Sequence, residues 1–183
     1  MKTSDAELLI LPGLGGGTPD HWYSRWEEKL QSARRIAPAD PDAPDRRQWT
    51  DALTRAVAEA KRPVVLIAHS LGTVLAVQAA AETALPGVAG AFLVGVPDLE
   101  RDDMPEATRA FAPLPRDPLP FPSLVVASRT DPWCAYERAE DFAASWGSHL
   151  VDAGDAGHLN SESGHGPWPE GLTRFAMLMK RVG

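Results

Sequence analysis

The sequence has little cysteine, little positive charge and no long apolar run. Its 183 residues include one cysteine, Cys134, which excludes an internal disulfide or a cysteine-rich metal site and suits a reducing cytosol. Lys and Arg number 18 against 25 Asp and Glu, so the net charge of −7 argues against binding to nucleic-acid phosphates. The longest apolar runs, 63–68 and 74–77, are too short to span a bilayer, and the first seven residues show no secretory signal. We therefore expect a cytoplasmic protein with neither a nucleic-acid nor a membrane partner.

Short strand-like runs alternate with helix-like segments along the chain. Apolar residues recur at helical spacing after Asp20, a candidate N-cap, and the stretch 71–82 is apolar on nearly every face and expected to be central. This alternation predicts one α/β domain over residues 1–183, a three-layer α/β/α sandwich whose six-stranded parallel sheet has the order 2-1-3-4-5-6. The predicted strands, short and bounded mostly by Gly, Pro or Asp, are 7–11, 33–37, 64–68, 90–96, 124–128 and 148–152.

The segment 98–122 differs from the rest of the chain in its proline content. It holds six prolines, at positions 105, 113, 115, 118, 120 and 122. Proline removes a backbone donor and interrupts helices and strands, so this density predicts a loop with one short helical piece around 106–112. The expected fold is therefore compact and has no cap domain.

Ser70 stands at a junction where a buried strand passes directly into an apolar helix. A nucleophile in such a tight turn needs small neighbours, and Ala68 and Gly72 provide them, although the usual pattern has glycine at the first position. The turn lifts the hydroxyl out at the carboxyl end of the strand, beside the N-terminus of the helix. The competing interpretation is that Ser70 only caps this helix. The strand before it and the helix after it favour the nucleophile.

The sequence resembles the α/β-hydrolases, and within them the small retinoblastoma-binding-protein-9-like serine hydrolases. The resemblance covers essentially the whole chain. Its motifs are Leu-Pro-Gly-Leu-Gly-Gly at 11–16, Ala-His-Ser-Leu-Gly at 68–72, Ser-Arg-Thr-Asp-Pro at 128–132 and Ala-Gly-His-Leu-Asn at 156–160, with Trp22 and Trp26 after the first.

A nucleophilic serine needs a base and an orienting acid, which this architecture supplies in the chain order Ser, Asp or Glu, His. Asp131 follows the fifth predicted strand and His158 the sixth, so both should emerge at the same sheet edge as Ser70. A turn or cap role for Asp131 and a surface role for His158 are the alternatives. Asp98, after the fourth strand, is the second candidate for the acid, and His165 is the reserve base.

The glycine-rich turn after the first strand is expected to complete an oxyanion hole. By position, the backbone N–H groups of Leu14 and Leu71 would bind the oxyanion. A dinucleotide-binding turn is the competing interpretation, because Gly13 and Gly15 open a strand–helix unit. It fails where a third glycine is needed, since Thr18 stands near that position.

Four of the six tryptophans fall into two groups. Trp22 and Trp26 recur at helical spacing and are expected in the core. Trp133, two residues after Asp131, and Trp168, after the histidine loop, are candidates for a pocket wall. Cys134 lacks an obvious base, so a buried structural role is expected for it.

Together these features predict a serine hydrolase that cleaves a carboxylic ester, thioester or amide of a small molecule through an acyl-enzyme. Ser70, His158 and Asp131 form the expected triad, and neither a cofactor nor a metal is implied. Two alternatives stay open: a catalytically idle scaffold that binds a protein partner through the proline-rich loop, and an acyltransferase that uses the same triad.

Overall fold

The computed structural model describes residues 1–36 and 40–182. In it a parallel sheet of six strands has the order β2-β1-β3-β4-β5-β6, as the sequence predicts. This order places β3 near the middle and sends every carboxyl end to one edge. The strands are β1 (Glu7–Leu11), β2 (Ala33–Arg35), β3 (Val64–His69), β4 (Val88–Val94), β5 (Ser123–Ala127) and β6 (His149–Asp152).

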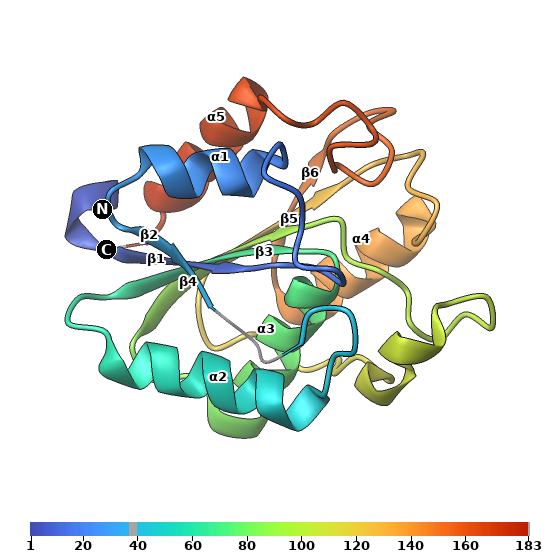
Figure 1. The fold of residues 1–183 in the computed structure, drawn as a ribbon, viewed down its shortest axis with the longest axis horizontal. Helices are drawn as coiled ribbons and strands as arrows, with labels where there is room; N and C mark the ends of the chain where they lie inside the picture. Colours follow the sequence, from blue (N-terminus) through green and yellow to red (C-terminus); the bar gives the residue numbers. More distant parts are fainter. Residues whose placement is uncertain (37–39, 183) are drawn as a thin grey trace.

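Helices cover both faces of the sheet and complete the three layers (Figure 1). On one face lie α1 (Trp22–Lys29) and α5 (Pro169–Met179). On the other lie α2 (Arg46–Glu59), α3 (Leu71–Thr83) and α4 (Tyr136–Trp146). Within residues 1–36 and 40–182, no helix combines the length and apolarity that crossing a membrane requires.

The central strand β3 shows why these residues form a doubly covered sheet. All six of its residues are buried, and successive side chains point to opposite faces. Leu66 and Ala68 join the apolar core under α2, α3 and α4, whereas Val65 and Ile67 join the core under α1 and α5. A run that is buried at every position, and apolar up to the terminal His69, is therefore what this location requires.

Several predicted boundaries shift by one or two residues. The second strand pairs with β1 only over Ala33–Arg35, and position 37 of the predicted run lies outside the described residues. The fourth strand ends at Val94 because Gly95 takes a positive φ of 61°. Asp20 does not cap α1; His21 occupies that position, and the Asp20 carboxylate pairs instead with Arg25 at 3.1 Å.

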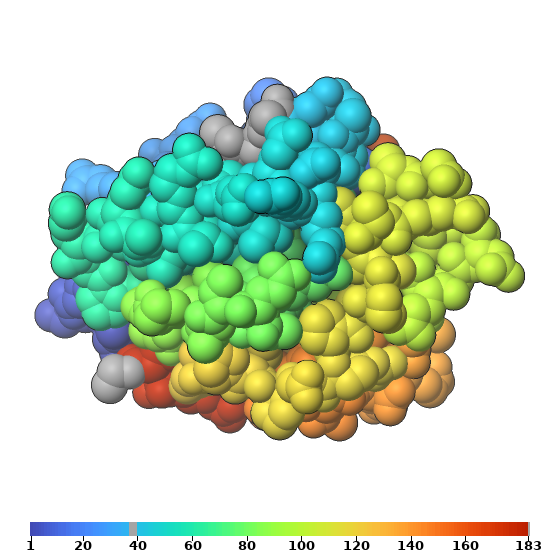
Figure 2. Space-filling view, turned by 90° about the horizontal axis from the view of Figure 1, so that it is seen from below, coloured from blue at the N-terminus to red at the C-terminus, as the bar shows by residue number. Residues whose placement is uncertain are grey.

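The proline-rich segment between β4 and β5 contains one 3₁₀ helix, Glu106–Phe111. Figure 2 shows this part of the chain, in yellow-green, projecting at one end of the molecule beyond α2 and α3. The segment follows the carboxyl end of β4, so it lies at the sheet edge where Ser70 emerges.

Candidate active site

Ser70 occupies a strained turn between β3 and α3. Its φ of 51° and ψ of −125° lie in a region that side-chain-bearing residues rarely adopt, as expected at a nucleophile elbow. The turn is crowded: a Cβ on Gly72 would overlap the carbonyl oxygen of Leu11, and a Cβ on Gly13 would lie 2.9 Å from that of Ser70. The Ser70 side chain makes no capping hydrogen bond to α3. Its hydroxyl is therefore free for another partner.

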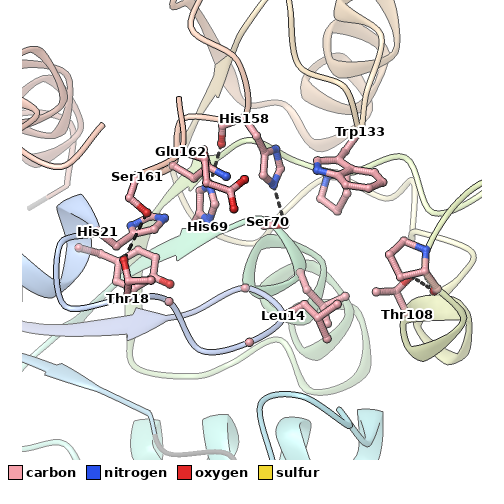
Figure 3. Close-up of a pocket in the computed structure, with 18 of the residues that line it drawn as sticks. Leu14, Thr18, His21, His69, Ser70, Thr108, Trp133, His158, Ser161 and Glu162 are labelled. Carbon is pink, nitrogen blue, oxygen red and sulfur yellow. Dashed lines mark hydrogen bonds between the residues drawn. The ribbon is translucent and has the colours of Figure 1, made fainter. Parts of the chain in front are cut away.

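That partner is His158. Its Nε2 lies 2.9 Å from Ser70 Oγ (Figure 3). Its Nδ1 lies 3.0 Å from both carboxylate oxygens of Asp131. The Asp131 and His158 side chains are only 4% and 9% exposed, so the hydrogen bonds between these two residues are shielded from water. The backbone N–H of Trp133 donates to Asp131 Oδ1 at 2.9 Å and helps to fix the carboxylate. The structure thus brings together the serine, histidine and aspartate that chain order predicts.

The backbone that carries His158 is held by two buried donors. His69 Nε2 donates to the His158 carbonyl oxygen at 2.9 Å, and Trp22 Nε1 donates to the Leu159 carbonyl oxygen at 2.9 Å. Leu159 itself has a positive φ of 53°. Such backbone costs free energy and persists only where its surroundings hold it. His69 and Trp22 thus help to keep the His158 ring directed at Ser70.

The rival residues lie elsewhere. Asp98 forms an ion pair with Arg138 at 3.3 Å, and His165 Nδ1 lies 3.2 Å from Ser163 Oγ. Cys134 is buried, and burial, reinforced by the charge of Asp131, raises the pKa of its thiol to about 12. Among the described residues no cluster of three or more His, Cys, Asp or Glu could hold a metal ion.

The amides of Leu14 and Leu71 are available as donors. In the part of the chain that the structure describes, neither one donates a hydrogen bond to another backbone or side-chain group. The Leu71 amide begins α3, and the first amides of a helix have no partner within the helix. Both leucines line the same pocket as Ser70.

A pocket of about 390 Å³ opens at Ser70 and His158. One side is apolar, and the proline-rich segment contributes to it. The other side is polar and is formed by the loop after β1 and the loop that carries His158 (Figure 3). The apolar lining includes Leu14, Pro97, Leu99, Met104, Pro105 and Trp133; the polar lining includes Thr18, His21, Asn160, Ser161 and Glu162.

The two tryptophans expected in the pocket wall lie in different places. Trp133 lines the pocket, whereas Trp168 does not. Trp168 is 4% exposed and packs against Trp22 and Trp26, with ring centroids 5.1 Å and 6.2 Å away. The expectation for Trp168 is thus corrected: this aromatic cluster under α1 and α5 buries the indole on one face of the sheet, away from the pocket.

His21 also lines the pocket, although its place in the sequence does not indicate this. It is 4% exposed, its ring stacks on Tyr23 with centroids 3.8 Å apart, and its Nδ1 has no hydrogen-bond partner among the described residues. Burial, with the nearby charge of Arg35, lowers the pKa of His21 to about 3. The sequence signal was weak, because a histidine before an amphipathic helix looks like an ordinary surface residue.

The buried histidines should make stability depend on pH. Burial lowers the pKa of His21 from 6.5 to about 3, and burial also lowers that of His69. In the unfolded protein both imidazole rings bind a proton as the pH falls below 6.5. In the folded protein both rings stay neutral at that pH. The free energy of unfolding should therefore be insensitive to these groups above that pH and decline below it. We expect His21 alone to remove about 2 kcal/mol between pH 7 and pH 5.

Urea denaturation at both pH values measures this loss. His21→Asn should show a smaller difference between pH 7 and pH 5 than the parent, while His149→Asn, at an exposed position on β6, should keep the parental difference. An identical difference in the parent and His21→Asn would contradict the prediction.

Comparison with known proteins identifies the family and the fold. A model of the serine hydrolase family matches residues 8–177. A YdeN-like hydrolase of Pectobacterium atrosepticum is 32% identical, with a TM-score of 0.88 over 99% of this chain and 95% of that one. No curated protein sequence gives a significant match.

More distant structures share the fold alone. The ydeN gene product of Bacillus subtilis is 17% identical, with a TM-score of 0.76 over 94% of this chain and 98% of its own. Est1E of Butyrivibrio proteoclasticus, with ferulic acid bound, is 14% identical, with a TM-score of 0.69 over 95% of this chain and 87% of its own. The family match, the fold and the whole-length likeness at 32% identity agree, and the chain belongs to the serine hydrolase family of the α/β-hydrolase superfamily.

Proposed function

We propose that the protein hydrolyses a carboxylic ester, thioester or amide of a small molecule through an acyl-enzyme on Ser70. The single observation that carries this proposal is the continuous hydrogen-bond path from Ser70 Oγ to His158 and on to both oxygens of Asp131. A serine hydroxyl is a weak nucleophile until a neighbouring base removes its proton, and an acid behind the base keeps the imidazole in the required tautomer.

The steps follow from the positions of the atoms. Ser70 Oγ attacks the carbonyl carbon while His158 Nε2 takes the hydroxyl proton, and Asp131 stabilises the imidazolium that forms. The amides of Leu14 and Leu71 bind the oxyanion of the tetrahedral intermediate, supported by the N-terminus of α3. Collapse of the intermediate breaks the bond to the leaving group, which receives the proton from His158. A water molecule then repeats the sequence and releases the acid.

The pocket favours a small substrate with an apolar acyl group. Its volume of about 390 Å³ suits a small molecule, and its apolar side lies next to Ser70. Leu14 is 38% exposed, which is unusual for a leucine in this chain and suits contact with an acyl chain. The ferulic acid bound to the distant neighbour Est1E supports the choice of carboxylic acid derivatives.

Rapid-mixing kinetics with p-nitrophenyl butyrate test this proposal. Formation of an acyl-enzyme should release one equivalent of p-nitrophenol per protein in a burst, before a slower steady state set by deacylation. The burst should be unchanged by EDTA, because no step uses a metal. Turnover with no acyl adduct on the protein, or activity that EDTA abolishes, would contradict a serine acyl-enzyme. Product analysis with an added alcohol separates hydrolysis from acyl transfer.

A further inference from the structure

We propose that the polar side of the pocket is a leaving-group subsite, and that Glu162 and His21 select esters whose alcohol carries a protonated amine. The inference rests on the proposed function and adds the chemical class of the leaving group. It comes from the charge and the unused hydrogen-bonding groups of this side of the pocket.

The position of His158 identifies this side as the exit of the leaving group. In the acylation step the leaving oxygen receives its proton from His158 Nε2, so the departing alcohol must lie beside that ring. Ser161 and Glu162 continue the same loop after His158 and line the pocket there. Ser161 Oγ lies 3.2 Å from Thr18 Oγ1, so this loop meets the loop after β1 and closes the polar side.

The charge of the lining favours a cation. Neither lysine nor arginine occurs among the described residues that line the pocket, and Glu162 is the one carboxylate among them. Glu162 is exposed and forms no ion pair or side-chain hydrogen bond within the described chain. Figure 3 shows its carboxylate extending toward the pocket between Ser161 and His158. An ammonium group there would meet an unpaired negative charge, whereas an anionic group would be repelled.

His21 supplies a second, independent observation. It lines the same side of the pocket, is more than nine-tenths buried, and its Nδ1 has no hydrogen-bond partner within the described residues. Buried polar groups without partners are rare in proteins because each forfeits its bonds to water. With its pKa lowered to about 3, the ring is neutral at ordinary pH and presents a nitrogen lone pair. An ammonium N–H is a donor that would complement it.

The chemistry balances without a further reactant. The bond between the acyl carbon and the alcohol oxygen breaks as the tetrahedral intermediate collapses, and His158 delivers the proton taken from Ser70 to that oxygen. The amino alcohol leaves with its ammonium still protonated. Glu162 and His21 contact the ammonium only, so they change selectivity and not the bond-breaking steps.

Three butyrate esters separate charge from hydrogen bonding. The choline ester has a cation without an N–H, the 2-(dimethylamino)ethanol ester has a cation with one N–H, and the 3,3-dimethylbutanol ester is the neutral isostere of the choline ester. Each kcat/KM is compared between the parent and a variant on the same ester, so the intrinsic reactivity of the ester cancels.

For Glu162→Gln we expect kcat/KM to fall about fivefold more on the two cationic esters than on the neutral one. This factor corresponds to the free energy that a partly exposed ion pair contributes. His21→Asn should lower kcat/KM more on the dimethylamino ester than on the choline ester, because only the dimethylamino ester can donate an N–H. Glu59→Gln, which removes a charge at the far end of α2, should leave the ratio of cationic to neutral ester as in the parent.

Equal effects of Glu162→Gln on kcat/KM for all three esters would overturn the subsite. A fivefold fall in the ratio of cationic to neutral ester with Glu59→Gln would overturn it as well. Failure of the proposed function looks different, because Ser70→Ala would then turn over the neutral ester as well as the parent does.

Discussion

Ser70→Ala is expected to keep its fold and to lose about 10³-fold or more in kcat on any ester that the parent hydrolyses. The variant lacks the oxygen that attacks the carbonyl, while the pocket and the oxyanion amides stay in place. Residual turnover should resemble catalysis by bound water. The loss should appear in kcat more than in KM, because the hydroxyl contributes little to binding the substrate.

Steady-state kinetics with p-nitrophenyl butyrate measure this effect, and a thermal melt confirms folding. Ser145→Ala, on α4 outside the pocket, is the matched control and should retain parental kinetics. Removal of the Ser70 hydroxyl should disturb the fold little, since its side-chain hydrogen bond within the described residues is to His158. If Ser70→Ala and Ser145→Ala hydrolyse esters equally well, Ser70 is not the nucleophile.

Asp131→Asn is expected to reduce kcat by about 10⁴-fold, far more than Asp98→Asn. The carboxamide that replaces the Asp131 carboxylate can donate to His158 Nδ1, which favours the tautomer with the proton on Nε2 and removes the acceptor that Ser70 needs. Asp98 follows the neighbouring strand but pairs with Arg138 at 3.3 Å. Its replacement therefore removes a structural ion pair and leaves the histidine oriented.

The two variants form their own control, because each changes one carboxylate to an amide of the same shape at the carboxyl edge of the sheet. Activity of each is read against its stability in urea, so that a folding defect is not mistaken for a catalytic one. Equal losses of kcat, or a larger loss in Asp98→Asn, would contradict Asp131 as the orienting acid and favour Asp98, which follows β4.

The fold follows from local sequence patterns because each buried strand carries its own signal. In β3 every residue is apolar or buried, as a strand with a core on each face requires, and nearly the same pattern marks β1 and β4. The short edge strand β2 is only half-buried, so its sequence carries no such signal and the end of its pairing at Arg35 could not be predicted.

Part of the site was predictable for a topological reason. Ser70, Asp131 and His158 each follow a strand of one parallel sheet, so chain order alone sends them to a common edge. Each of the three residues follows the end of its strand directly or after a short loop, which keeps the side chains within hydrogen-bonding distance of one another.

The polar side of the pocket was not predictable in this way. His21 precedes α1 and Glu162 lies near the end of the chain, and no sequence pattern links them. They line the same pocket because the loops that carry them touch at Thr18 and Ser161, a contact that exists only in the folded protein. Trp168 shows the reverse case: its nearness to His158 in sequence suggested a pocket wall, but the indoles of Trp22 and Trp26 bury it in the core.

The most direct test of the central claim is labelling with a fluorophosphonate, which reacts with a serine hydroxyl only when a neighbouring base activates it. The protein is incubated with the probe, digested and mapped by mass spectrometry, with Ser70→Ala and His158→Ala in parallel. We expect one adduct on Ser70 in the parent, none in Ser70→Ala and strongly slowed labelling in His158→Ala. An unlabelled parent, or an adduct on another residue, would contradict an activated Ser70.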